Sequence, residues 1–362
     1  MRFVIACGGT GGHLFPGLAV AEELRAGGHE VMLLVSEKEI DARALSSFPD
    51  MPRETLPSVG LPSLLSPAAF KFVARLFASY RKCGALCGKF QPDAVLGMGG
   101  FTSIAPVAAA WRRGIPAFLH DSNAIPGKAN RLGARFCRQI LLGFEECGRH
   151  FSGRSVRVTG TPIRRELSRS VPTKSDARRA LGLDADRRTL LVMGGSQGAS
   201  GINSLMAEAA AGLRDSELQI VHLSGERDAE KLRSAYAAAG LSAVVLPFCD
   251  RMQDVYAAAD LAISRSGAAS LTELSWFGLP SVLVPYPHAA EDHQTLNARI
   301  FERAGAAKIF SEKEASGGSL ATVLKSLLAS GASLESMAAA AKSLAPRDAA
   351  KRVAEVLTHA NR

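Results

Sequence analysis

The segment with the clearest chemical potential is the glycine-rich run at residues 8–12, which His13 follows directly. Apolar residues at 2–7 precede the glycines and apolar residues at helical spacing follow them, a pattern that predicts a strand, a turn and a helix. Glycines at such a turn let backbone N–H groups approach an electron-rich ligand, and His13 can take or give a proton. The alternative is a tight turn capped by Thr10, without a ligand.

Two further glycine-rich turns follow predicted strands, at 97–100 and 194–198. None of the three turns fits the Gly-x-Gly-x-x-Gly dinucleotide pattern, because Leu14 stands at the third glycine position of the first run. None is followed by the Gly-Lys-Ser/Thr of a Walker loop. A phosphate group would therefore have to be bound in another way.

The strongest candidate for an anion site is the segment 264–273, SRSGAASLTE, which follows a predicted strand and opens a predicted helix. Its small residues expose the first N–H groups of that helix, and these donors together with the helix dipole favour a diphosphate. The carboxylate of Glu273 can accept hydrogen bonds from two vicinal hydroxyls, as in a ribose. The alternative is a capping box, with Ser270 as N-cap and Glu273 three residues later.

Two polar loops add further candidates. His293 and Gln294 follow a predicted buried strand, and such imidazole and amide groups can recognise sugar hydroxyls. Asp121 and Asn123 lie at the end of another predicted strand, where the alternative is ordinary turn chemistry. The histidines lack metal-ligand spacing and the six cysteines are scattered, so we expect no metal site.

The elements that position these residues alternate between strands and helices. This βαβ rhythm predicts a doubly wound parallel sheet, in which ligands bind at the carboxyl ends of the strands. The pattern restarts at residue 188, so we expect two similar Rossmann-like α/β domains facing a cleft. The first domain spans 1–163, with the helix at 346–362 packing back on it, and the second spans 164–345. Strands are predicted at 2–7, 30–35, 94–97, 117–120, 188–193, 219–223, 243–247, 261–264 and 281–284, and the main helices at 16–26, 67–90, 105–112 and 346–360.

The positive charge of the chain, +9 in total, is concentrated in its first part. Residues 55–92 contain no Asp or Glu but carry five Lys and Arg among many apolar residues. A basic and apolar surface suits an anionic membrane or an anionic lipid. The alternatives are a core helix with solvated basic residues, or nucleic acid, against which stand the absence of a recognised module and the 6% aromatic content. No signal peptide and no apolar run of about 20 residues is present, so we expect a cytoplasmic protein.

Seven segments in order resemble glycosyltransferase family 28, over nearly the whole chain. The resemblance implies a GT-B fold and an inverting transferase that moves N-acetylglucosamine from UDP-N-acetylglucosamine to the C4 hydroxyl of undecaprenyl-diphosphoryl-N-acetylmuramoyl pentapeptide (lipid I), forming lipid II for peptidoglycan synthesis. The alternative is another GT-B enzyme that uses this nucleotide sugar, such as a 2-epimerase. The segments are GGTGGHLFPG (8–17), LGMGGFTS (96–103), LHDSNAIPG (119–127), GTPIR (160–164), GGSQGA (194–199), RSGAASLTE (265–273) and EDHQTLNA (291–298).

The resemblance also implies roles for single residues. His13 would be the catalytic base, with Asp121 as a rival or an orienting partner, and Cys249 would contact the uracil through its backbone. Asp121 stands where the family often has Glu, and Thr161 where it often has Asn. The implied substrate-binding residues are Thr10, Gly11, Gly12, Asn123, Arg164, Ser196, Cys249, Ala268, Ala269, Ser270, Leu271, Thr272, Glu273, His293 and Gln294.

The resemblance finally implies a location and partners. The donor would bind mostly to the second domain and the acceptor mostly to the first. The enzyme would be a peripheral protein on the cytoplasmic face of the inner membrane, docked through 55–92. It would need neither a cofactor nor a metal, would bind no nucleic acid, and would work with the machinery of cell-wall synthesis, cell shape and cell division.

Overall fold

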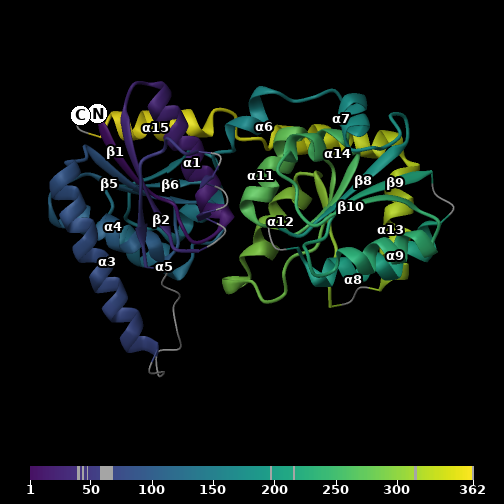
Figure 1. The fold of residues 1–362 in the computed structure, drawn as a ribbon, viewed down its shortest axis with the longest axis horizontal. Coiled ribbons are helices and arrows are strands. Elements are labelled where there is room, and N and C mark those ends of the chain that lie inside the picture. The colour runs from purple at the N-terminus through teal and green to yellow at the C-terminus, as the bar shows by residue number, and fades with distance from the viewer. Residues whose placement is uncertain are drawn as a thin grey trace. The chain divides into compact units, whose positions relative to one another are not determined.

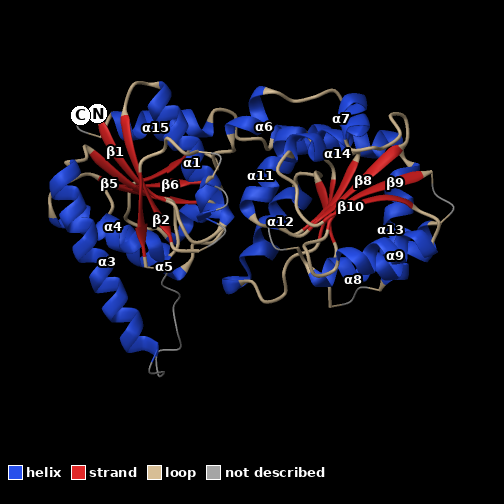
Figure 2. Cartoon of the chain, viewed as in Figure 1, coloured by secondary structure: helices blue, strands red, loops and turns tan. Residues whose placement is uncertain are grey.

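A computed structural model describes residues 1–38, 41–42, 45–46, 48–57, 68–195, 198–214, 217–313 and 316–360. The chain divides into two compact units, which are unit 1 (Met1–Arg165 with Pro346–Arg362) and unit 2 (Glu166–Ala345). Each unit is a parallel sheet with helices packed on it (Figures 1 and 2). This confirms the predicted fold class of two parallel α/β domains.

Within the described residues, the sheet of unit 1 has seven strands in the order β3-β2-β1-β4-β5-β6-β7, and all neighbours are parallel. Successive side chains of a strand point to opposite faces, so Phe3 and Ile5 enter one core while Val4 and Ala6 enter the other. The strands are β1 (Arg2–Ala6), β2 (Glu30–Ser36), β3 (Arg53–Leu56), β4 (Ala94–Gly97), β5 (Ala117–Asp121), β6 (Gln139–Leu142) and β7 (Val156–Val158).

Helices cover both faces of this sheet. Leu18 of α1 and Leu357 of α15 join the core that contains Phe3, whereas Cys83 of α3 and Val107 of α4 join the opposite core. The last helix of the chain therefore completes the first unit. The helices are α1 (Gly11–Ala26), α3 (Ala68–Phe90), α4 (Phe101–Arg112), α5 (Lys128–Gly133) and α15 (Ala349–Thr358), with 3-10 turns η1 (Ala134–Phe136) and η2 (Glu145–His150).

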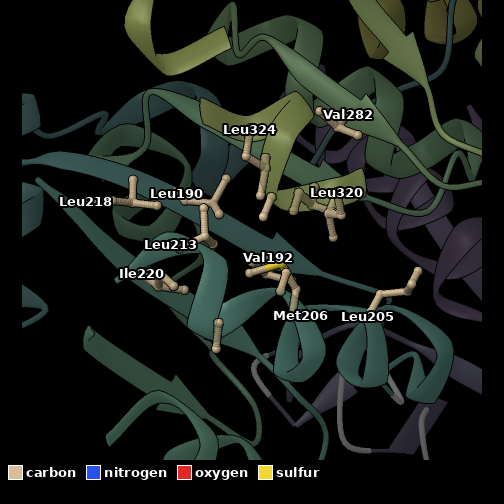
Figure 3. Close-up of a cluster of buried hydrophobic side chains, with 14 of the residues drawn as sticks. Leu190, Val192, Leu205, Met206, Leu213, Leu218, Ile220, Val282, Leu320 and Leu324 are labelled. Atoms are coloured by element: carbon tan, nitrogen blue, oxygen red, sulfur yellow. The ribbon is translucent and has the colours of Figure 1, made fainter. Parts of the chain in front are cut away.

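In the described part of unit 2, six parallel strands follow the order β10-β9-β8-β11-β12-β13. Figure 3 shows the core on one face, where Val192 from the sheet meets Met206 and Leu324 from two helices. The strands are β8 (Arg188–Met193), β9 (Leu218–Leu223), β10 (Ser242–Leu246), β11 (Leu261–Ser264), β12 (Ser281–Leu283) and β13 (Ala307–Ile309).

The helices beyond Ile163 precede, separate and follow these strands. They are α6 (Arg165–Arg169), α7 (Lys174–Ala180), α8 (Ser200–Ala209), α9 (Ala229–Ala238), α10 (Met252–Ala258), α11 (Ala268–Phe277), α12 (His293–Arg303), α13 (Gly317–Ala329) and α14 (Gly331–Ser343), with 3-10 turns η3 (Ala210–Leu213) and η4 (Ala290–Asp292).

The strand order reverses once in each sheet. In unit 1 the chain runs outward from β1 to one side and from β4 to the other, and in unit 2 the same holds for β8 and β11. Ligands of doubly wound sheets bind at the carboxyl ends of the strands at this switch point. The turns at 8–12 and 98–100 follow the switch strands of unit 1, and those at 194–198 and 265–267 follow the switch strands of unit 2.

Two local predictions were wrong. Helices α1 and α4 begin at Gly11 and Phe101, several residues before the predicted starts, and each contains a proline, Pro16 or Pro106, in its second turn. A proline removes one intrahelical hydrogen bond but leaves the others intact, so neither marks a helix start. Strands β3, β6, β7 and β13 were not predicted. Strands β3, β7 and β13 carry exposed side chains, so they lack the continuous apolar run that marked β4, β11 and β12.

Candidate functional site

The glycine turn after β1 holds His13 in the first turn of α1. Gly9 has a φ of 111°, a conformation that favours glycine, and Thr10 occupies the N-cap position. The Thr10 side chain does not cap the helix; its Oγ1 lies 3.1 Å from Nδ1 of His13 instead. Thr10 therefore serves to orient the imidazole, and the interpretation of a simple capped turn is wrong.

The imidazole of His13 rests on the bare backbone of the turn after β4. A Cβ atom built on Gly99 would lie 3.1 Å from Nε2 of His13, and one built on Gly100 would lie 3.1 Å from its Cε1. Both glycines have positive φ values, 109° and 72°. Any side chain at either position would push the ring away, so two separate glycine turns define one position for His13.

Burial makes His13 a neutral group. Loss of solvent lowers the pKa of His13 to about 4, with the carboxylate of Asp41 opposing this shift and the ammonium of Lys38 adding to it. At neutral pH the ring is therefore unprotonated and has a lone pair available. A neutral imidazole at a switch point has a lone pair that can accept a proton from a bound hydroxyl.

Asp121 lies at the end of β5 and is connected to the same turn through Asn130. Its Oδ2 accepts the amide N–H of Asn130 at 2.7 Å, and its Oδ1 accepts the backbone N–H of Asn123 at 3.0 Å. The Oδ1 of Asn130 in turn accepts the N–H of Gly100 at 3.1 Å. Burial raises the pKa of Asp121 to about 6, although these hydrogen bonds oppose the shift. The arrangement suits an orienting partner better than a second base.

Asn130 was missed because nothing in the sequence distinguishes it from a polar residue of an ordinary short helix. A second missed residue is Asp41, which is fully buried. Its Oδ2 accepts the N–H of Gly9 and the N–H and hydroxyl of Ser36, at 2.9, 2.9 and 2.6 Å. Lys38 donates to the carbonyl of Gly9 at 2.8 Å, so the Gly9 turn is held from both sides.

Arg164 is the remaining predicted residue of unit 1. Its guanidinium lies over the ring of Phe15, 4.4 Å from the ring centroid. Phe15 belongs to α1 and follows His13 by two positions, so Arg164 is brought to the start of that helix. A cation at this position can face an anionic ligand bound at the helix start.

In unit 2 the segment after β11 forms a helix start without a capping side chain. Gly267 is the N-cap of α11, so Ser270 lies inside the first turn and the capping-box interpretation is wrong. The N–H groups of Ala268, Ala269 and Ser270 precede the first intrahelical bond, which Leu271 makes to Gly267 at 3.0 Å. Three backbone donors at one helix start can bind a diphosphate.

Not every predicted residue of this segment is available to a ligand in the same way. Leu271 uses its N–H within the helix and its side chain is buried, and the hydroxyl of Thr272 donates to the carbonyl of Ala268 at 2.8 Å. Glu273 is 9% exposed, and its Oε2 accepts the hydroxyl of Tyr256 at 2.6 Å. Tyr256 is a third residue that sequence reasoning missed.

The turn after β8 has the geometry of a close backbone approach. Gly195 and Gly198 have φ values of 138° and 75°, and the N–H of Gly198 donates to the carbonyl of Gly195 at 3.0 Å. A Cβ atom on Gly198 would lie 2.3 Å from the carbonyl oxygen of Ser224, so only glycine fits there. Ser196, a predicted binding residue, lies outside the described residues.

The remaining predicted residues follow β12 and β10. His293 bonds through Nδ1 to the carbonyl of Ala290 at 2.7 Å, which makes Nε2 the acceptor of the neutral ring. Gln294 accepts the N–H of Tyr286 at 2.9 Å through Oε1, so its amide nitrogen is the atom that can donate to a ligand. Cys249 is half-buried three residues after β10, and burial raises its pKa.

The exposed side of α3 is apolar and basic. Phe70, Val73 and Phe77 are 88%, 61% and 59% exposed and recur at helical spacing. In Figure 1, this helix runs beyond the sheet of unit 1 at its N-terminal end. Lys71 and Arg75 lie on the same helix and are exposed. Residues 58–67 of the predicted membrane stretch lie outside the described residues.

A third basic residue of α3, Lys82, is engaged within unit 1. Its ammonium pairs with Glu54 at 2.9 Å and donates to the carbonyl of Thr55 at 2.8 Å.

Among the described residues, no helix is long and apolar enough to cross a membrane. The described part of the chain also has no group of three His, Cys, Asp or Glu side chains able to hold a metal ion.

Comparison with known proteins identifies the family. Residues 3–142 match the glycosyltransferase family 28 N-terminal domain and residues 189–353 match its C-terminal domain. A Geobacter metallireducens protein named UDP-N-acetylglucosamine–N-acetylmuramyl-(pentapeptide) pyrophosphoryl-undecaprenol N-acetylglucosamine transferase is 38% identical, over 100% of this chain and 99% of that protein. The chain belongs to glycosyltransferase family 28.

Solved structures agree with this membership. MurG from Acinetobacter baumannii is 29% identical, with a TM-score of 0.77 over 99% of both chains. A UDP-N-acetylglucosamine 2-epimerase from Neisseria meningitidis has a TM-score of 0.70, over 99% of this chain and 100% of that one, at 14% identity. The latter likeness extends to the fold alone. The family 28 membership makes the protein a glycosyltransferase, as the sequence motifs predicted.

Proposed function

We propose that this family 28 glycosyltransferase transfers N-acetylglucosamine from UDP-N-acetylglucosamine to the C4 hydroxyl of lipid I, forming lipid II with inversion at the anomeric carbon. The observation that carries the proposal is the neutral His13, held between two glycine turns at the switch point of unit 1. The full-length identity to enzymes named for this reaction supports the choice of substrates.

The donor nucleotide binds to unit 2 in this proposal. The N–H groups of Ala268, Ala269 and Ser270 receive the diphosphate, and Glu273 receives the ribose hydroxyls. The transferred sugar lies against His293 and Gln294, one an acceptor and the other a donor. The backbone at Cys249 contacts the uracil. Leu271 and Thr272 belong to the same helix, α11, and support the start that receives the diphosphate.

The acceptor reacts from unit 1. His13 takes the proton of the C4 hydroxyl while the C4 oxygen attacks the anomeric carbon and the bond from that carbon to the diphosphate breaks. Thr10, Gly11 and Gly12 shape the acceptor side, and Asn123 with Asp121 fixes the adjoining loop. UDP leaves with both bonding electrons, and the helix donors stabilise its charge. The groups that stabilise the negative charge of UDP are backbone donors of the chain itself, so we infer that no cofactor takes part.

The exposed side of α3 supports a membrane location. Phe70, Val73 and Phe77 can enter the boundary between headgroups and acyl chains, while Lys71 and Arg75 meet anionic headgroups. This placement suits a lipid-linked acceptor and a peripheral enzyme at the cytoplasmic face of the membrane. Proteins of cell-wall synthesis are the partners expected there.

A single assay separates transferase from epimerase. UDP release from UDP-N-acetylglucosamine is measured with and without a short-chain lipid I analogue. Release that requires the acceptor, accompanied by a disaccharide product, is the expected result. Formation of the 2-epimer without acceptor would instead identify an epimerase, and turnover that ignores the acceptor would contradict the proposal.

A further inference from the structure

Tyr256 contacts α11 at two points on one side of that helix. Its ring stacks on Phe277, with ring centroids 5.1 Å apart and an interplanar angle of 30°. Its hydroxyl donates to Oε2 of Glu273 at 2.6 Å. Glu273 and Phe277 are four residues apart in α11, and residues at this spacing are neighbours on a helix surface. The single side chain of Tyr256, from α10, can therefore contact both of them. The ring stack fixes the hydroxyl, and the hydroxyl fixes one oxygen of the carboxylate.

This contact lies almost entirely away from solvent. Tyr256 is 2% exposed and Glu273 is 9% exposed. A short hydrogen bond from a hydroxyl to a carboxylate is among the stronger kinds in proteins, and it offsets part of the desolvation of the acid.

A fixed carboxylate binds a diol better than a mobile one. The Glu side chain has three rotatable bonds, and ordering it on binding costs entropy that a pre-organised site avoids. Each carboxylate oxygen has two lone pairs, so Oε2 can accept Tyr256 and a ligand hydroxyl together. The hydroxyl of Tyr256 thus orients the carboxylate of Glu273 and does not prevent that carboxylate from accepting a ligand hydroxyl.

We propose that Tyr256 is a positioning residue that holds Glu273 for the two ribose hydroxyls and thereby selects ribonucleoside diphosphates. The inference rests on the proposed function, in which Glu273 binds the ribose of UDP. It extends that function by placing the source of sugar selectivity in a residue that does not touch the ligand.

The test is isothermal titration calorimetry of the full chain with UDP and with 2′,3′-dideoxyuridine diphosphate. Tyr256→Phe removes the hydroxyl and keeps the ring stack on Phe277. We expect this variant to bind UDP about tenfold more weakly, equivalent to about 1.4 kcal/mol. Its affinity for the dideoxy nucleotide should change by less than about twofold, because that ligand makes no use of Glu273.

Two further variants make the result specific. Tyr236→Phe removes another buried hydroxyl of unit 2, the one that lies 2.7 Å from Nδ1 of His222, and should affect both nucleotides equally. In a Glu273→Gln background, adding Tyr256→Phe should cause no further loss of UDP affinity, since coupled residues are not additive. Thermal unfolding of each variant establishes that it is folded.

The possible outcomes distinguish failure of the positioning role of Tyr256 from failure of the proposed function. An equal loss for both nucleotides in Tyr256→Phe, or full additivity with Glu273→Gln, overturns the positioning role while leaving the proposed function intact. A wild-type chain that binds both nucleotides equally removes Glu273 from ribose recognition, and the inference with it. A wild-type chain that binds neither nucleotide defeats the proposed function itself.

Discussion

The side-chain amide of Asn130 joins Asp121 to Gly100: its nitrogen lies 2.7 Å from Oδ2 of the acid, and its oxygen accepts the glycine N–H at 3.1 Å. The buried carboxylate thus acts on the turn that supports His13, rather than on His13 itself. This relationship assigns different roles to the two residues that the sequence offered as rival bases, and it makes the difference measurable.

Replacing His13 by Ala should lower the rate of transfer by about 10²–10⁴, the usual contribution of general base catalysis. UDP affinity should stay within about twofold of wild type, because His13 belongs to unit 1 and the proposed nucleotide donors to unit 2. Single-turnover transfer to a soluble lipid I analogue and calorimetry with UDP provide the two measurements. A variant that retains wild-type turnover would exclude His13 as the base.

Removing Asn130 should disturb His13 without touching it. Asn130→Ala leaves the Gly100 N–H and Asp121 Oδ2 without their partner, at a cost of about 1–3 kcal/mol, and loosens the turn. We expect kcat to fall about tenfold to a hundredfold, which is the effect of raising the activation free energy by an amount similar to this cost. Gln139→Ala, which removes an exposed amide bonded to Ser155 in the same unit, is the control and should keep wild-type activity.

The pH dependence of kcat/KM should report Asp121 and His13 separately. Burial raises the pKa of Asp121 to about 6, so this acid gains a proton as the pH falls through 6 and one of its acceptor bonds is lost. At pH 5 the ionised fraction, and with it the activity, should be about a tenth of the value well above pH 6.

Asp121→Asn should abolish this decrease. Its activity should be lower than that of wild type but constant down to about pH 4, where His13 becomes protonated. Retention of the step near pH 6 in this variant would show that another group controls it.

Asp41 should contribute to stability as well as to activity. Asp41→Ala removes the acceptor of three donors, two of them backbone N–H groups, from a fully buried position. We expect the free energy of unfolding to fall by about 3 kcal/mol, measured by urea denaturation, together with a lower kcat. Asp50→Ala, at an exposed position of the same region, should leave both unchanged.

The exposed apolar side of α3 should govern membrane binding. Phe70→Ser with Phe77→Ser removes two rings that can each contribute about 1.5–3 kcal/mol when buried, so sedimentation with phosphatidylglycerol vesicles should fall at least tenfold. Turnover of a soluble acceptor analogue should not change. Arg75→Glu should weaken the same binding, more than Lys82→Glu does, because Lys82 is already paired with Glu54.

The matched control is Val171→Ser, which removes a 49% exposed apolar side chain from unit 2. It should leave vesicle sedimentation at the wild-type level. Unchanged binding of the Phe70 and Phe77 double variant would locate the membrane contact elsewhere on the chain.

The sequence predicted the fold class and the switch-point turns because both depend on local patterns. Strands such as β1 and β8 are mostly apolar and are followed closely by glycines. His13 comes directly after the glycine-rich run that follows β1. The hydrogen-bond partners were not predictable in this way. Asn130 meets Gly100 across 30 residues and Asp41 meets Gly9 across 32, and such pairs depend on the register of the finished sheet.

The capping-box interpretation of Ser270 and Glu273 failed for a related reason. The spacing of three residues was correct, but the helix begins at Ala268 and the carboxylate bonds to Tyr256 instead. A local motif and a long-range contact compete for the same side chain, and only the tertiary structure decides between them. The predicted start of α1 at Pro16 was also wrong: Pro is common at the first position of a helix, but here it lies in the second turn.

The return of α15 to unit 1 has a consequence for how the protein is made. Val353 and Leu357 complete the core beneath β1 and α1, yet they follow the whole of unit 2 in the chain. The first unit must therefore wait, incomplete, while the whole of the second unit is synthesised and able to fold. The turn that carries His13 acquires its full support only after unit 2 has been synthesised, so a chain that stops before α15 lacks a finished first unit.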